Sequence, residues 1–120
     1  MKSIILNNPR NQIKIRTDIA NSFYTKFLGL MGRNSIPMDF GLLLSEKSEC
    51  IINTSIHMLF MRFDITAIWL DHDLNVISIQ LAKKWHLAYA SKKPAMHVLE
   101  LHSSQFNNFS IGDKLEISQN

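Results

Sequence analysis

The sequence predicts a mainly β protein: a compact antiparallel β-sandwich or distorted barrel with one helix near its N-terminus. Two observations support this class. The 120 residues are 46% apolar and 19% charged, a composition typical of one globular domain. Short stretches of alternating apolar and polar residues then follow one another along most of the chain, without the regular intervening helices of a parallel α/β sheet. We therefore expect a single domain over residues 1–120.

The first predicted elements are a strand and a helix. Residues 12–16 alternate polar and apolar side chains, which predicts a half-buried strand. Asn21 or Ser22 can cap the start of a helix, and Gly32 or Asn34 can end it. The helix would present one apolar face, made by side chains at helical spacing: Phe23, Phe27, Leu30 and Met31.

The rest of the chain is predicted to form short strands. Residues 41–45 and 96–101 are two of them, and residues 56–61, apolar except for His57, predict a central strand. Residues 65–70 and 77–81 flank a turn rich in Asp and Asn, which predicts a hairpin. A short helical turn is expected over residues 103–109, before a Gly112-Asp113 turn and a last strand at residues 115–117.

Charge and cysteine content narrow the function classes. The net charge is +3, and Lys83, Lys84, Lys92 and Lys93 lie in one short segment beside Trp85. Such a segment could meet phosphates and stack on a base or sugar, although a solvated basic loop is the simpler interpretation. Intramolecular disulfides are excluded because the chain has one cysteine. No stretch reaches the about 20 apolar residues of a membrane span or has the apolar centre of a signal peptide, so we expect a cytoplasmic protein.

Five motifs in order resemble one family. Residues 56–71 read IHMLFMRFDITAIWLD, and residues 27–33 read FLGLMGR. Between these two motifs lies GLLL at residues 41–44. After them come HVLEL at residues 97–101 and IGDKL at residues 111–115. In this order they resemble the bacterial and archaeal domain-of-unknown-function family 192, over about residues 13–117. The resemblance implies a mostly β, jelly-roll-like fold with one N-terminal helix, and it implies no activity.

Two positions depart from the pattern of this family. Thr66 stands where the family usually has Asp, and His102-Ser103-Ser104 stand where it usually has Gly. If the family Asp were catalytic, this chain would be a poor enzyme. If that Asp only bonds a turn, the Thr66 hydroxyl can partly replace it.

Three residues are candidates for catalysis: His57, Arg62 and Glu100. His57 interrupts an apolar stretch, where it would be either a core histidine with a hydrogen-bond partner or a general base. Glu100 shares a strand face with apolar residues, so we expect it to be partly buried. A buried carboxylate needs a partner or has a raised pKa. We therefore expect Glu100 to pair with Arg33 or Arg62.

No metal site or cofactor is predicted. The five histidines lack the spacing of metal ligands, and no phosphate-binding loop or nucleophile motif is present. Asp71 lies in the hairpin turn and is expected to cap it, rather than to hold a cation. The residues to which the sequence assigns structural roles are Arg33, Thr66, Asp71, Gly112 and Asp113.

These observations favour a small, non-catalytic, β-rich binding or accessory module, whose ligand lies in a groove of the sandwich or on the basic loop over residues 83–93. The candidate ligand-binding residues of that loop are Lys83, Lys84, Trp85, Lys92 and Lys93. An alternative is a small hydrolase-like enzyme that uses His57, Arg62 and Glu100. A further alternative is a weak nucleic-acid binder that uses the basic loop over residues 83–93. The sequence does not identify the ligand or any partner protein. We expect a monomer or a weak dimer, because the edge strands of a small β domain can pair between chains.

Overall fold

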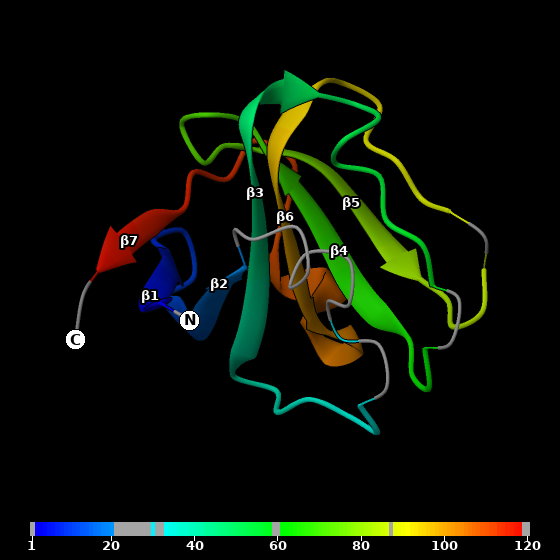
Figure 1. Ribbon diagram of the computed structural model, residues 1–120. Helices are drawn as coiled ribbons and strands as arrows, with labels where there is room; N and C mark the ends of the chain where they lie inside the picture. The colour runs from blue at the N-terminus through cyan, green and yellow to red at the C-terminus, as the bar shows by residue number, and fades with distance from the viewer. Residues whose placement is uncertain (1, 21–29, 31–32, 59–60, 87, 119–120) are drawn as a thin grey trace.

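The computed structural model describes residues 2–20, 30, 33–58, 61–86 and 88–118. Its strands form one seven-stranded sheet in the order β5-β4-β6-β3-β2-β1-β7 (Figure 1). The elements are β1 (Lys2–Asn8), β2 (Ile13–Ala20), β3 (Phe40–Cys50), β4 (Ile65–Leu70), β5 (Val76–Ala82), β6 (Ala95–His102), the 3₁₀ helix η1 (Ser103–Asn108) and β7 (Glu116–Ser118). The mainly β fold class is confirmed.

The sheet is mixed, which differs from the predicted antiparallel arrangement. β2 and β3 run parallel, whereas every other neighbouring pair of strands is antiparallel. All strands of the described residues belong to this one sheet, and the sheet is not closed into a barrel. The sequence pattern of a strand is the same for parallel and antiparallel neighbours when one face is buried, so alternation alone could not reveal the parallel pair.

The N-terminal region holds a strand that the sequence analysis missed. β1 buries Ile4 and Leu6 and pairs with both β2 and β7. The predicted helix over residues 22–31 lies almost entirely outside the described residues. A short 3₁₀ helix, η1, is found where the sequence predicts a helical turn over residues 103–109.

The predicted central strand over residues 56–61 is wrong for the residues described. Ile56 forms only an isolated bridge with Tyr89, and the positions of the central strands belong to β6 and β3. Ile56 and Met58 are buried while His57 between them is exposed. The segment therefore buries alternate side chains against the sheet from outside, a pattern that its apolar composition does not distinguish from a strand within the sheet.

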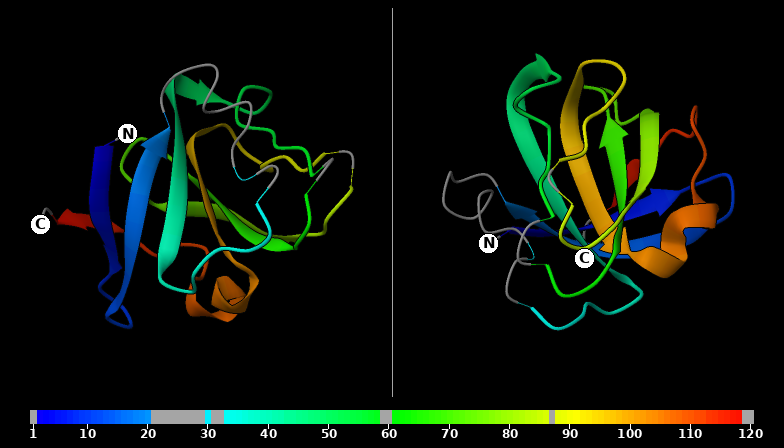
Figure 2. Two further views of the ribbon diagram at one scale, coloured as in Figure 1. Left: turned by 60° about the horizontal axis from the view of Figure 1, so that its bottom comes forward. Right: turned by 90° about the vertical axis from the view of Figure 1, so that its right-hand side faces the viewer.

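The sheet is strongly twisted, so that β1 and β2 run in a different direction from β4 and β5 (Figure 2). Two apolar clusters pack on its two faces. The first includes Leu42, Ala67, Trp69 and Val98 of the sheet. Five side chains outside the sheet pack against them: Leu30, Ile36, Ile56, Met58 and Met61. The second joins the two halves of the sheet and includes Leu6, Ile15, Ile68, Leu99 and Leu101.

An irregular ribbon extends the β3–β6 pair over the first cluster. After a register shift between Ser45 and Cys50, the pairs Cys50–Ala95 and Ile56–Tyr89 keep one common offset. We call residues 50–58 and 85–95, without the undescribed residue 87, the β3–β6 ribbon. Trp69 anchors it, because its indole Nε1–H donates to the Thr54 carbonyl at 2.8 Å. Among the described residues, no helix is long and apolar enough to cross a bilayer.

Candidate ligand-binding site around Glu100

Glu100 lies in the middle of β6, with a neighbouring strand on each side. Its register partners are Leu42 on β3 and Ala67 on β4. Residues directly opposite one another share a face of the sheet, so the Glu100 side chain lies on the face of the first apolar cluster. We call this the Glu100 face. Only 7% of Glu100 is exposed, as its alternation with apolar residues predicts.

The Glu100 carboxylate has no hydrogen-bond or ion-pair partner among the described residues. The predicted ion pair with Arg33 or Arg62 is therefore wrong. The Arg33 guanidinium lies over the ring of Phe40, 5.5 Å from its centroid. Arg62 donates from Nη1 to Asn34 Oδ1 at 2.5 Å. Both cations that the sequence offers to Glu100 thus have other contacts.

The Glu100 oxygens are nevertheless not fully covered by other atoms. Every fully enclosed side-chain nitrogen or oxygen in the described part of the chain has a hydrogen-bond partner. Because the Glu100 carboxylate has none, its oxygens are not fully enclosed. The uncovered part of the carboxylate is where a ligand group would contact it.

The two buried acids of the described chain have opposite pKa shifts. Burial raises the pKa of Glu100 to about 7. The pKa of Asp113 is lowered, first by its hydrogen bond with Arg10, although desolvation opposes this effect. An apolar site favours the neutral acid, whereas hydrogen bonds to a cation and to amides favour the carboxylate. Glu100 is therefore the buried acid that changes its charge near neutral pH.

His57 and Arg62 are not joined to Glu100 by any hydrogen bond or ion pair. Both side chains are exposed, whereas Glu100 is buried. The prediction of a core histidine at position 57 is therefore wrong, because alternate residues of this segment face the sheet and His57 faces away. The geometry provides no shared contact through which the three candidates could act on one substrate.

The basic loop presents its side chains to solvent, as predicted. Lys83, Lys84, Lys92 and Lys93 are exposed, and 56% of Trp85 is exposed. Asp64 partly neutralises this surface, since its carboxylate lies 3.6 Å from the Lys83 ammonium and accepts a hydrogen bond from the Lys84 amide.

Trp85 has an unusual backbone conformation. Its φ is +68°, in the left-handed region that bulky residues rarely adopt. The Trp85 amide donates to the Met58 carbonyl at 2.7 Å, and the Met58 amide donates to the His86 carbonyl. Hydrogen bonds between the two segments of the β3–β6 ribbon therefore hold the exposed tryptophan in a strained position.

The two departures from the family pattern meet in the structure. The Thr66 hydroxyl lies within 3.1 and 3.2 Å of the carbonyls of His102 and Ser103, at the start of η1. The His102 side chain accepts a hydrogen bond from the Ser104 amide and so caps this helix. Thr66 thus has a structural contact, in agreement with the interpretation that its hydroxyl bonds a turn.

The predicted turn residues bond the backbone around them. Asp71 Oδ1 accepts hydrogen bonds from the amides of Asp73 and Asn75, each at 2.9 Å. Gly112 has a φ of +98°, a conformation that suits glycine. No group of three or more His, Cys, Asp or Glu side chains that could hold a metal ion is present in the described ranges.

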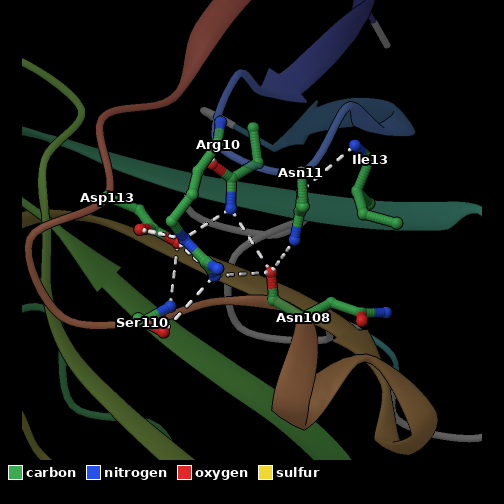
Figure 3. Close-up of polar contacts among 7 residues, drawn as sticks. Arg10, Asn11, Ile13, Asn108, Ser110 and Asp113 are labelled. Carbon is green, nitrogen blue, oxygen red and sulfur yellow. Dashed lines mark hydrogen bonds and ion pairs between the residues drawn. The ribbon is translucent and has the colours of Figure 1, made fainter.

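The structure contains one polar network that the sequence analysis missed. Of its residues, only Asp113 was predicted to have a structural role, in a turn. Arg10, between β1 and β2, bonds Asp113 and Ser110, and Asn11 donates to the Asn108 carbonyl at 2.6 Å (Figure 3). The signal available in the sequence was the polar run Asn7-Asn8-Pro9-Arg10-Asn11, which is typical of a turn. It could not reveal a partner 103 residues away.

The comparison with known families agrees with the motif order. The family model of DUF192, described as "Uncharacterized ACR", matches residues 5–117. The chain belongs to the DUF192 family. The resemblance stated from the motifs is thereby confirmed, and DUF192 carries no assigned function.

Curated proteins similar to this DUF192 chain come from archaea and carry the family name UPF0127. UPF0127 protein TK1120 of Thermococcus kodakarensis is 38% identical over 85 residues, which are 71% of this chain and 52% of that protein. UPF0127 protein PF1050 of Pyrococcus furiosus is 34% identical over 107 residues, which are 88% of this chain and 89% of that protein. The chain thus spans about half the length of the first relative and most of the second.

Two solved bacterial structures share the fold of this DUF192 chain. A "putative transcription regulator" from Sinorhizobium meliloti is similar with a TM-score of 0.83 and 20% identity, over 96% of this chain and 92% of that one. A protein of unknown function from Novosphingobium aromaticivorans is similar with a TM-score of 0.82 and 18% identity, over 95% and 83%. At these identities the likeness concerns the fold alone.

Proposed function

We propose that this DUF192 protein is a small, non-catalytic ligand-binding module, and that its ligand meets Glu100 on the Glu100 face. The observation that carries the proposal is the nearly buried carboxylate with no partner among the described residues. Leaving a buried polar group without a partner costs about 1–3 kcal/mol, and more when it is charged. A bound ligand that supplies the missing partner offsets this cost.

Binding is favoured over catalysis because the candidate catalytic groups do not act as a unit. Glu100 is buried, whereas His57 and Arg62 are exposed and have no hydrogen bond to it. General acid–base catalysis needs groups within hydrogen-bond reach of one reacting atom. The alternative function is that of a hydrolase-like enzyme in which Glu100 acts as the general acid or base. We propose further that the module is one cytoplasmic domain.

The proposal is tested by a thermal-shift screen with a library of small metabolites. Each compound is tested against the wild type, Glu100→Gln and Glu116→Gln. Glu116 is an exposed acid on β7, so its variant controls for the loss of one negative charge. A site at Glu100 gives compounds that raise the melting temperature of the wild type and Glu116→Gln but not of Glu100→Gln. The proposal is wrong if every hit stabilises all three proteins equally, or if no compound stabilises the wild type.

A second candidate function is binding of single-stranded nucleic acid at the basic loop. The specific observation in its favour is Trp85, which is exposed, strained and directly preceded by Lys83 and Lys84. Exposed aromatic rings beside cations are the usual platform for stacked bases. Fluorescence anisotropy with a labelled oligonucleotide over a salt series tests it. Binding at low salt that Trp85→Ala removes and Lys14→Ala keeps supports this function, and absence of low-salt binding refutes it.

A further inference from the structure

The surroundings of Glu100 determine which ligand could satisfy it. On β3, the residues that share its face are Phe40, Leu42 and Leu44, and on β4 they are Ile65, Ala67 and Trp69. All six are uncharged, and the Trp69 N–H is already bonded to Thr54. The strands on both sides of Glu100 therefore supply it with no charged group.

Charged and titratable groups on the other adjoining elements are engaged elsewhere. His102, two residues along β6 on the same face, bonds the Ser104 hydroxyl and amide through Nδ1. In the segments that cover this face, Arg33 lies over Phe40 and Arg62 bonds Asn34. The Tyr89 hydroxyl, which packs against the same cluster, accepts a hydrogen bond from the Lys83 amide. The described chain thus places an acid in an apolar site and assigns it no positive charge.

We propose that the ligand of Glu100 carries a primary ammonium group on a short apolar chain. This inference rests on the ligand site proposed above. An anionic ligand would be repelled by the carboxylate, and a divalent metal ion needs several oxygen ligands where the described residues offer one carboxylate. An ammonium group is small enough to contact a carboxylate that is mostly covered, and its alkyl chain would lie against apolar side chains such as Leu42 and Ala67.

The proposed complex couples binding to a proton. Below the pKa of Glu100, the carboxyl group is mainly neutral, so a bound ammonium displaces its proton to solvent and pairs with the carboxylate that remains. The ammonium keeps its three protons, and no covalent bond other than that O–H bond changes. With a pKa of about 7, the ionised fraction rises from about one-tenth at pH 6 to about nine-tenths at pH 8. Affinity should rise about tenfold over this range.

The probes are n-butylammonium chloride and its neutral analogue n-butanol. Binding is followed by NMR chemical shifts of the wild-type protein at pH 6, 7 and 8, at constant ionic strength. We expect butylammonium to bind about ten times more tightly at pH 8 than at pH 6, and butanol to bind weakly with no pH dependence. Glu100→Gln should lose butylammonium binding, and Glu116→Gln should keep it.

A second measurement needs no variant, in case Glu100→Gln folds poorly. The carboxyl carbon of Glu100 is titrated by ¹³C NMR with and without butylammonium, and the bound cation should lower its apparent pKa. Equal binding of both probes, or an unchanged titration, overturns the ammonium inference. If compounds from the thermal-shift screen still depend on Glu100 for binding, the proposed ligand-binding function is retained although the ammonium inference is wrong. If no compound depends on Glu100, both the binding function and the ammonium inference are wrong.

Discussion

Arg10 and Asp113 form a two-point ion pair, with Nε 2.7 Å from Oδ1 and Nη2 3.1 Å from Oδ2. This pair fastens the turn between β1 and β2 to the turn after η1. Asp113 also accepts hydrogen bonds from Asn8 Nδ2 and from the Ser110 amide. One nearly buried carboxylate thus joins three segments of the chain.

Asp113→Ala should lower the free energy of unfolding by about 1–3 kcal/mol at pH 7, because the buried Asn8 amide loses an acceptor. Since the pKa of Asp113 is below its usual range, its contribution is full above about pH 4 and fades as the pH falls through the folded pKa. Urea unfolding at pH 7 and at acid pH measures both effects. The free energy of unfolding of the variant should depend less steeply on pH below about pH 4 than that of the wild type.

The matched control is Asp39→Ala. Asp39 pairs with Arg16 at 3.0 Å, but both side chains are more than half exposed. Exposed ion pairs contribute little, so this variant should unfold at nearly the wild-type urea concentration. Equal destabilisation by the two substitutions would show that the Arg10–Asp113 network has no special structural importance.

Glu100 should make the protein less stable as the pH rises from 4.5 to 7. In this range the folded protein holds a proton that the unfolded chain has released, because the pKa of Glu100 is raised from 4.5 to about 7. The corresponding fall in the free energy of unfolding is on the order of 3 kcal/mol. Urea unfolding of the wild type and of Glu100→Gln across this range measures it, and the variant should lack this fall. Parallel pH profiles would contradict the assignment.

Gly41→Ala should destabilise the fold by about 1–3 kcal/mol through overpacking. A Cβ at this position would lie 2.7 Å from Leu101 Cδ2 and 3.0 Å from Ile15 Cγ2. The midpoint of urea unfolding should fall, and combination with Leu101→Val should cost less than the sum of the two single changes. Gly112→Ala is the control for backbone strain, because its φ is +98° and the space around it is open. Additive effects of the Gly41 and Leu101 changes would exclude steric overlap.

Thr66→Asp should destabilise this chain by about 1–3 kcal/mol, although the family usually has Asp there. The carboxylate would face the carbonyls of His102 and Ser103, which now accept from the Thr66 hydroxyl. His102→Gly should reduce this loss, because it frees the Ser104 amide to donate to the new carboxylate. A double-mutant cycle by urea unfolding measures the coupling, and independent effects would refute it.

The alternation of apolar and polar residues predicted strand pairing where the two strands are close in the sequence. The hairpin of β4 and β5 follows from alternating residues on both sides of an Asp-rich turn, and its pairs Ile65–Ala82 and Ile68–Ile79 agree. Burial of Glu100 followed from the same alternation. The parallel β2–β3 pair did not, since it depends on how the chain between these strands crosses over.

The partners of Glu100 could not be predicted for a related reason. Alternation fixes the face on which a side chain lies, but a salt bridge also needs a cation at the right place on a separate segment. Arg33 and Arg62 lie in segments outside the sheet, where Phe40 and Asn34 hold them. His57 shows the same limit, because its segment covers the sheet instead of joining it.

The pairing of β1 with β7 has a consequence for synthesis of the chain. Asn7 and Ser118 are 111 residues apart and hydrogen-bonded. At about 5–20 residues per second, β1 leaves the ribosome on the order of 5–20 s before the strand that covers its outer edge. During that time the nascent chain exposes a strand edge open to association with other chains. The three residues of β7 therefore cover a strand edge that stays open during most of the synthesis of the chain.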